Sequence, residues 1–204
     1  MSRGRIIGVL ALQGDFERHL FRLSALGVAG REVRRQEDLI GLDGLIIPGG
    51  ESTTMSELID RFELRENLEK FCSAKPVWGT CAGMILLARE VDDERVRPLN
   101  IIDVAVVRNG YGRQINSFFA DIQASLNGNQ TALKASFIRA PVVTGYGPGV
   151  QVLATYQNSP VLLAQGNCLV SSFHTELHDD LSLTRYFLEE FVTGIRESRQ
   201  RINL

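Results

Sequence analysis

Short apolar runs alternate with stretches of helical periodicity through the first half of the chain. The apolar runs are rich in β-branched residues, which favours strands at 5–12, 28–33, 44–48 and 75–79. Between them, apolar residues recur every three or four positions, which predicts helices over 15–27, 52–61 and 82–90 and around 64–72. Ser52 or Thr53 is the expected N-cap of the second helix. This alternation predicts a parallel sheet with helices on both faces, a three-layer α/β/α sandwich.

The second half of the chain changes to closely spaced strands. They are predicted at 101–107, 117–124, 134–138, 150–156, 161–165 and 168–173. Turns rich in glycine and asparagine separate them, among them 145–147. Apolar residues from Leu183 to Ile195 then form one face of a final helix, and the charged tail 196–204 is expected to fray. No repeat or long linker divides the chain, so we expect one domain over 1–204 around a mostly parallel central sheet.

Composition narrows the class of protein without naming a function. The 204 residues include 22 basic and 24 acidic side chains, a formal net charge of −2, and 44% are hydrophobic. That is ordinary globular composition, and no basic surface is expected that would hold nucleic acid. The longest apolar run, 6–12, is far shorter than the about 20 residues of a membrane helix. Three cysteines without a C-x-x-C spacing indicate a reducing compartment, so we expect a cytoplasmic protein.

One of these cysteines lies in a pattern that carries chemistry. Gly79-Thr80-Cys81-Ala82-Gly83 joins a predicted strand to a predicted helix, which is the cysteine form of the nucleophile elbow. The turn would lift the thiol above the sheet edge, over a helix N-terminus that favours a thiolate, with the Ala82 N–H facing a developing oxyanion. A buried structural cysteine is the alternative. We assign that structural role to Cys72 and Cys168.

A cysteine nucleophile needs a base and a group that orients the base. His174 and Glu176 follow the last predicted strand with the i, i+2 spacing that puts both side chains on one face. Glu176 would hold the tautomer of His174 while His174 takes the thiol proton. His19 is expected to face water from an amphipathic helix. The alternative for His174, Glu176 and His178 is a zinc site of the form H-x-E-x-H.

Two further loops follow predicted strands. Gly49, Gly50 and Glu51 end one strand, where glycines allow the backbone to approach a ligand and a peptide N–H to face an oxyanion. Arg108 opens the polar loop 108–114, and Arg139 ends another strand. Arginine suits a carboxylate, although an arginine on a loop is more often simply solvated. On their own, these two loops do not indicate a function.

Taken in order, these segments resemble one family over nearly the whole chain. The segments that carry the resemblance are Leu12-Gln13-Gly14-Asp15, Gly50-Glu51-Ser52-Thr53, the elbow, 108–114 and Ser172-Phe173-His174-Thr175-Glu176. Together they closely resemble the glutaminase subunits of pyridoxal phosphate synthase, which are class I (triad) glutamine amidotransferases. Thr175 departs from the pattern, since many relatives carry proline there. The resemblance implies a flavodoxin-like, class I glutamine amidotransferase fold.

The resemblance also implies roles for single residues. Cys81, His174 and Glu176 would be the catalytic triad, with Gly50 and Ala82 donating to the oxyanion. The residues implied to contact glutamine are Gly49, Gly50, Glu51, Arg108, Ile138 and Arg139. Neither a metal nor pyridoxal phosphate is implied in the glutaminase itself. L-Glutamine would be the substrate, and ammonia would pass to a synthase subunit within a large hetero-oligomer. Low activity alone is implied, with the synthase completing the oxyanion hole near Gly49–Glu51.

Three other functions remain open on the sequence. The chain could be an elbow-cysteine hydrolase of the peptidase or stress-response branch that does not use glutamine. It could be a zinc hydrolase that uses the H-x-E-x-H residues. It could also be a non-catalytic regulatory subunit that keeps the fold to bind a partner.

Overall fold

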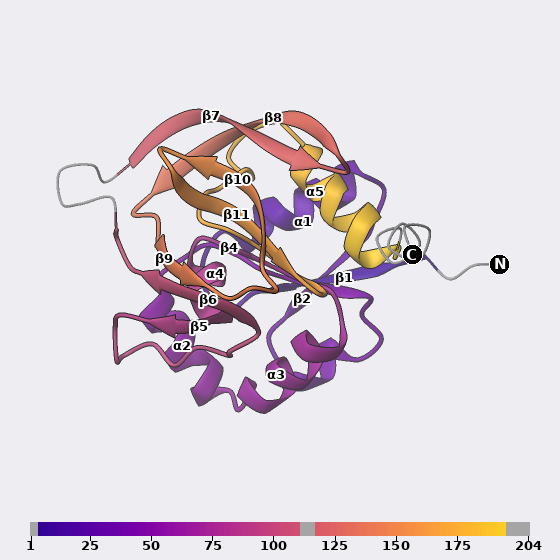
Figure 1. The fold of residues 1–204 in the computed structure, drawn as a ribbon. Coiled ribbons are helices and arrows are strands. Elements are labelled where there is room, and N and C mark those ends of the chain that lie inside the picture. Colours follow the sequence, from indigo (N-terminus) through magenta and orange to yellow (C-terminus); the bar gives the residue numbers. More distant parts are fainter. Residues whose placement is uncertain (1–3, 111–116, 195–204) are drawn as a thin grey trace.

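The computed structural model describes residues 4–110 and 117–194. Most elements alternate between strand and helix up to residue 91, and strands dominate afterwards (Figure 1). The strands are β1 Ile6–Leu10, β2 Ala29–Val33, β3 Gly44–Ile47, β4 Val77–Thr80, β5 Ala88–Val91, β6 Ile102–Val107, β7 Ser117–Leu126, β8 Asn129–Ile138, β9 Val142–Tyr146, β10 Gln151–Tyr156, β11 Ser159–Gln165 and β12 Cys168–Ser171. The helices are α1 Phe16–Ala25, η1 Gln36–Leu39, α2 Ser52–Arg61, α3 Arg65–Ala74, α4 Ala82–Leu87, α5 Ser182–Tyr186 and η2 Phe187–Val192.

A nine-stranded sheet runs through the centre of the molecule. Its strand order is β2-β1-β3-β4-β12-β11-β10-β7-β8. Every pairing from β2 to β12 is parallel, and every pairing from β12 to β8 is antiparallel. Although β12 is far from β3 and β4 in sequence, it lies beside β4 with their carboxyl ends at the same edge. Ligand sites of parallel α/β sheets occur at this edge, so the topology brings the elbow and the segment after β12 together.

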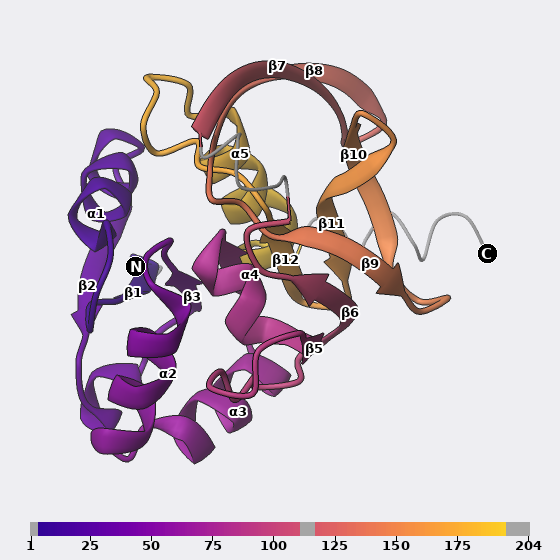
Figure 2. The same cartoon turned by 90° about the vertical axis from the view of Figure 1, so that its left-hand side faces the viewer.

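Each face of the parallel half carries its own hydrophobic core, because alternate strand residues point to opposite sides. On one face, Leu45, Ile47 and Val77 pack with apolar residues of α2, α3 and α4. On the other, Ile46 and Trp78 pack with residues of α1, α5 and η2. Figure 2 shows α1 and α5 on the side of the sheet away from α2 and α3. The three-layer α/β/α class predicted from the sequence is confirmed.

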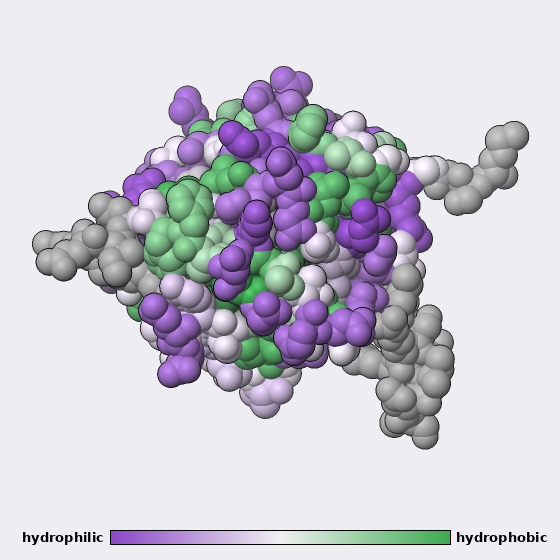
Figure 3. Space-filling model, turned by 90° about the horizontal axis from the view of Figure 1, so that it is seen from above, coloured by the Kyte–Doolittle hydropathy of each residue, from purple (hydrophilic) through white to green (hydrophobic). Residues whose placement is uncertain are grey.

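The antiparallel strands extend this sandwich in two ways. The β7–β8 hairpin arches over the top of the molecule in Figures 1 and 2. A separate three-stranded sheet, β5-β6-β9, packs Val104, Val106 and Val143 into the core of α2 to α4. From above, apolar side chains form several patches separated by polar ones (Figure 3). No helix in residues 4–110 and 117–194 is long and apolar enough to cross a membrane.

Several predicted boundaries were wrong. The helix expected over 82–90 ends at Leu87, and the chain continues as β5, whose pairing with β6 could not be read from apolar content. The turn expected at 145–147 begins inside β9, where Gly145 and Tyr146 pair with β6. The final helix is an α-helix followed by a π-helical turn, η2. Ile195, the tail 196–204 and positions 111–114 of the arginine loop lie outside the described residues.

Candidate active site

Cys81 stands between β4 and α4 in a conformation that side-chain-bearing residues rarely adopt. Its φ is 49° and its ψ is −103°. Its backbone N–H donates to the Ser171 carbonyl of β12 at 2.8 Å, which ties the turn to the neighbouring strand. A Cβ on Gly83 would lie 2.0 Å from the Ile47 carbonyl oxygen, so a glycine is required where α4 crosses β3. This is the strained strand-to-helix turn that the G-x-C-x-G pattern predicts.

His174 and Glu176 lie side by side just after β12. Nδ1 of His174 is 2.5 Å from Oε1 of Glu176, and Glu176 is almost completely buried. The backbone of His174 is fixed by two hydrogen bonds with Ser136 of β8, at 2.8 and 3.0 Å. The imidazole also interacts with the Cys81 thiol, and this interaction raises the pKa of His174. Because Nδ1 is engaged by the carboxylate, Nε2 is the nitrogen that serves the thiol.

The charges of the site favour an ionised His174–Glu176 pair. Burial disfavours the imidazolium, but contacts with Cys81 and Glu176 outweigh it and raise the pKa of His174 to about 10. Burial would likewise raise the pKa of Glu176, but His19 and His174 hold it well below the usual value. The carboxylate of Glu176 is therefore ionised at neutral pH, and it stabilises the imidazolium form of His174.

His19 does not face water as expected. Only 1% of it is exposed, and its Nε2 lies 3.6 Å from Oε1 of Glu176. The periodicity of α1 placed Phe16 and Leu20 on the buried face, yet these two are only half-buried, while His19, Arg22 and Leu23 are buried. An amphipathic pattern cannot distinguish a buried histidine with a polar partner from a solvated one, because the partner comes from elsewhere in the chain.

A cavity of about 300 Å³ opens above the thiol. It is lined by all six residues that the resemblance assigned to glutamine: Gly49, Gly50, Glu51, Arg108, Ile138 and Arg139. Cys81 and His174 also line it, so the candidate nucleophile, the candidate base and the candidate binding residues share one space. Gln13, Asn109, Ile85 and Leu177 also line the cavity. Gln13 and Asn109 lie in segments that carry the family resemblance, but no role was assigned to any of these four residues from the sequence. Ala82 follows Cys81 as the first residue of α4.

The Gly49–Gly50 segment fits tightly between the base and α1. A Cβ on Gly49 would lie 2.2 Å from Cε1 of His174, so no larger residue fits without moving the imidazole. The Gly49 carbonyl accepts the Asp15 N–H at 3.3 Å, and the Glu51 N–H donates to Oε1 of Gln13 at 2.8 Å. The loop after β3 is therefore held by the segment that leads into α1.

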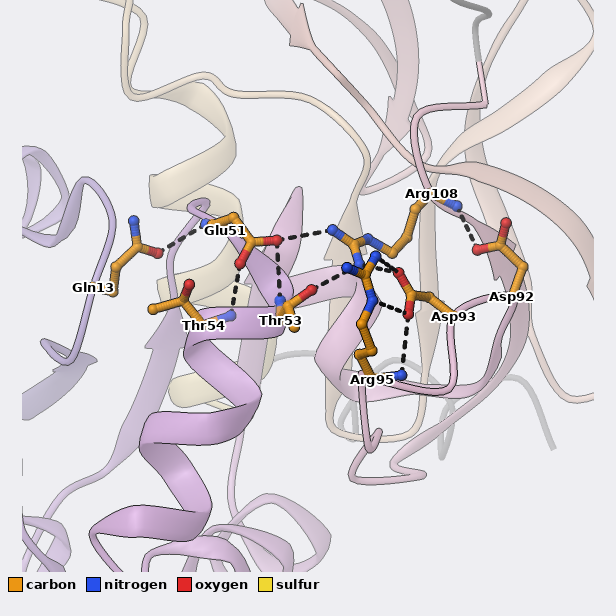
Figure 4. A network of polar contacts seen from close by, with 8 residues as sticks. All are labelled: Gln13, Glu51, Thr53, Thr54, Asp92, Asp93, Arg95 and Arg108. Atoms are coloured by element: carbon orange, nitrogen blue, oxygen red, sulfur yellow. Dashed lines mark hydrogen bonds and ion pairs between the residues drawn. The ribbon is translucent and has the colours of Figure 1, made fainter.

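Glu51 and Arg108 form the polar wall of the cavity (Figure 4). Arg108 contacts Oε1 of Glu51 at 2.8 Å, Oγ1 of Thr53 at 2.8 Å and Oδ2 of Asp93 at 2.5 Å. Partial burial would raise the pKa of Glu51, but the N–H groups of Thr54 and Thr53 lower it to about 2. Those bonds make Glu51 the N-cap of α2, not Ser52 or Thr53 as predicted. Asp93 was not predicted because its loop has no motif.

Ile138 and Arg139 come to the cavity from the end of the β7–β8 hairpin. The Ile138 carbonyl oxygen lies 3.8 Å from Sγ of Cys81, and Arg139 has a φ of 44°. Arg139 is exposed, whereas the side chain of Arg108 is 16% exposed and paired. The two arginines therefore differ, with Arg108 fixed in place and Arg139 open to solvent.

His178, Cys72 and Cys168 make other contacts. Nε2 of His178 lies 2.8 Å from Oγ of Ser136, whereas His174 contacts Glu176. Within the described part of the chain, no three His, Cys, Asp or Glu side chains are arranged to hold a metal. Cys72 and Cys168 are fully buried, and burial raises the pKa of the Cys72 thiol to about 12 and that of Cys168 as well. Both thiols are therefore unreactive packing groups.

Comparison with known proteins places this geometry in context. Residues 9–193 match the SNO glutamine amidotransferase family. A protein of Fervidobacterium nodosum named pyridoxal 5'-phosphate synthase subunit PdxT is 49% identical over 185 residues, 90% of this chain and 96% of that protein. A relative of the same name from Thermosipho africanus is 50% identical over 183 residues, covering 89% and 96%.

Solved structures agree with these relatives. A crystal structure described as a glutamine amidotransferase matches with a TM-score of 0.84 at 44% identity, covering 93% of this chain and 99% of the other. PurLQS from Thermotoga maritima matches with a TM-score of 0.63 at 13% identity, covering 92% and 98%. The second likeness supports the fold alone.

Proposed function

The chain belongs to the SNO glutamine amidotransferase family, and on that premise we propose that it hydrolyses L-glutamine to L-glutamate and ammonia and supplies the ammonia for pyridoxal 5'-phosphate synthesis. The observation that carries the proposal is the thiol, imidazole and carboxylate of Cys81, His174 and Glu176, joined at one end of a cavity lined by Glu51 and Arg108. That cavity offers opposite charges, as an α-amino acid requires.

The proposed reaction proceeds through a thioester. The thiol proton resides on His174, in keeping with the ionised His174–Glu176 pair, and Sγ of Cys81 attacks the side-chain amide carbon of glutamine. The N–H groups of Gly50 and Ala82 stabilise the oxyanion of the tetrahedral intermediate. When the C–N bond breaks, His174 returns the proton to the departing ammonia. Water, deprotonated by His174, then attacks the thioester and releases glutamate and the thiol.

We propose that the charged wall of the cavity holds the two ends of the glutamine backbone. The carboxylate of Glu51 suits the α-amino group, and a guanidinium suits the α-carboxylate. Arg108 already lies against Glu51 and Asp93, which fixes its position but uses part of its charge. Exposed Arg139 faces the same space, with Gly49 and Ile138 filling the remaining wall.

The partner of this glutaminase follows from the names of its relatives. They are called subunits of pyridoxal 5'-phosphate synthase, so a separate synthase subunit would receive the ammonia. We propose that the two subunits form a large hetero-oligomer and that the synthase completes the oxyanion hole at Gly49–Glu51. The three cysteines are free thiols, which supports a cytoplasmic location.

Glutamate release from glutamine, measured with and without the synthase subunit, tests the function. We expect turnover that the synthase increases. The Cys81→Ala variant should lose at least about 10⁴-fold in kcat, because the reaction loses its nucleophile. The matched control Cys72→Ala removes a buried thiol on α3, away from the cavity, and should keep its kcat.

Each alternative has its own outcome in this assay. Full activity of Cys81→Ala would contradict the proposed mechanism. Loss of activity with a chelator and its return with zinc would favour a metal hydrolase. Stable binding of the synthase without turnover would favour a regulatory subunit, and peptide cleavage without glutamine turnover would favour the peptidase branch.

A further inference from the structure

Helix α1 buries two polar side chains against the segment that carries the triad acid. His19 and Arg22 are 1% and 4% exposed, one turn apart on the same face of the helix. Both point to residues 175–180, which follow β12 and lie far from α1 in sequence. Burying polar groups is unfavourable unless they are paired, so this placement calls for an explanation.

His19 and His174 converge on one oxygen atom. Nε2 of His19 lies 3.6 Å from Oε1 of Glu176. The same oxygen atom is hydrogen-bonded to Nδ1 of His174 at 2.5 Å. Nε2 of His19 is also 3.5 Å from Oγ1 of Thr80, next to the nucleophile. The ring stands edge-on to Trp78, with centroids 5.6 Å apart at an angle of 86°. These contacts fix the ring on the buried side of the carboxylate.

The chemistry of the contact identifies the tautomer of His19. The ionised carboxylate of Glu176 only accepts hydrogen bonds, so its charge favours a proton on Nε2, the nitrogen of His19 that faces it. Nδ1 of His19 is buried without a partner, as is Oε2 of Glu176. An unpartnered lone pair is tolerated better there than an unpartnered N–H. Nε2 of His19 is therefore the protonated nitrogen.

Arg22 fixes the main chain around the same carboxylate. Its guanidinium donates to the Thr175 carbonyl at 2.8 Å and to the Asp180 carbonyl at 2.5 Å. These two carbonyls flank Glu176 in the chain. Arg22 thus holds the backbone of the segment, while His19 contacts the carboxylate itself.

Building on the proposed glutaminase function, we propose that His19 is a positioning residue: its Nε2–H holds Oε1 of Glu176 against Nδ1 of His174, which keeps Nε2 of His174 directed at Cys81. The residue never touches substrate. Its effect is on the orientation of the base, and small misplacements of a catalytic group lower the rate strongly. A histidine that merely fills space beside Trp78 would affect stability and leave kcat unchanged.

Two variants of similar length separate these roles. His19→Gln keeps an N–H donor near the position of Nε2, and His19→Met removes the donor while filling a similar volume. With the synthase present, we expect His19→Met to lower kcat by about tenfold to a hundredfold with KM within about twofold. His19→Gln should recover most of that loss. Equal kcat in a folded His19→Met variant and the wild type would overturn the proposal, as would equal losses in both variants.

A double-mutant cycle shows whether His19 acts through the triad acid. In a Glu176→Gln background, His19→Met should lower kcat by less than about twofold, because the group that it positions is already altered. Losses that multiply would show that His19 acts independently of Glu176 and would overturn the proposal.

The wild-type protein provides a test that needs no variant to fold. Nitrogen-15 NMR of the imidazoles reports the tautomer of His19, and we expect a proton on Nε2. A proton on Nδ1 with Nε2 unprotonated would overturn the proposal.

The wild-type assay separates the proposed glutaminase function from the proposed role of His19. Absence of glutamine turnover in the wild type contradicts the glutaminase function. An unaffected His19→Met variant beside an active wild type contradicts only the role of His19.

Discussion

Three residues of the site occupy the left-handed region of backbone space without being glycine. Cys81 has a φ of 49°, Asn109 a φ of 52° and Arg139 a φ of 44°, and all three line the cavity. Such conformations cost about 1–3 kcal/mol each and persist where surrounding contacts enforce them. For Cys81, the enforcing contacts are the bond to Ser171 and the glycine at position 83. The strained turn therefore places Cys81, the proposed nucleophile, at the wall of the cavity.

The raised pKa of His174 predicts a pH dependence of stability. Its value of about 10 exceeds the roughly 6.5 of an unfolded histidine, so the stabilisation is complete below pH 6.5 and is lost as pH rises through 10. Urea unfolding of the wild type and His174→Gln should show a difference that shrinks by on the order of 2 kcal/mol between pH 6.5 and pH 10.5. A difference independent of pH would contradict the charged pair.

Single residues show how far sequence reasoning reaches. Cys81, His174 and Glu176 were predicted because glycine spacing and the i, i+2 rule are local signals. The structure brings them together with the six candidate binding residues. The burial of His19, the contact of Gln13 with Glu51 and the place of Asp93 were not predicted, because each depends on a partner on another element. No local pattern marks such a residue.

At the scale of elements, the site is built from the ends of strands and the beginnings of helices. β3 ends just before Gly49 and Gly50, β4 just before Cys81, β12 just before His174, and β8 at Ile138. The element types of the first half were predicted well because helical and strand periodicities differ. The end of α4 was predicted wrongly, because the residues that follow it form β5 through pairing with β6 and not through their own composition.

The cap of α2 links the stability of an element to substrate binding. Removing the Glu51 carboxylate in Glu51→Ala takes acceptors from the N–H groups of Thr53 and Thr54 and a partner from Arg108. We expect a loss of about 1 kcal/mol in the free energy of unfolding and a higher KM for glutamine.

The matched control is Glu57→Ala, an exposed glutamate on the same helix. It should stay within about 0.5 kcal/mol of the wild type in urea unfolding, with KM unchanged. If Glu51→Ala matched this control in both measurements, neither the cap nor its role in binding would stand.

At the scale of the whole molecule, one sheet joins the early and late parts of the chain. β12 pairs with β4 on one side and β11 on the other, and each face of the sheet has one core. The sequence predicted the three layers because strands alternate with helices up to residue 91. It could not predict the antiparallel order β12-β11-β10-β7-β8 or the second sheet, since pairing between distant strands leaves no periodic signal.

We propose that residues 1–204 form one domain, and the shared sheet predicts a single unfolding transition. Trp78, the only tryptophan, is fully buried in β4, where its ring contacts His19 and its indole N–H donates to Oγ of Ser171. Its fluorescence, the far-ultraviolet circular dichroism and glutamine turnover should therefore change together along a urea titration. Separate midpoints for fluorescence and dichroism would indicate more than one folding unit.

The position of β12 also matters for how the protein is made. Synthesis at about 5–20 residues per second delivers β1 to β4 and the Cys81 turn well before β12, His174 and Glu176. Until β12 is added, β4 has an unpaired edge, which is a known route to aggregation. A chain whose translation stops before residue 168 would hold a thiol without its base and an open strand beside it. A chain interrupted there would therefore lack His174 and Glu176 and, with them, the proposed glutaminase activity.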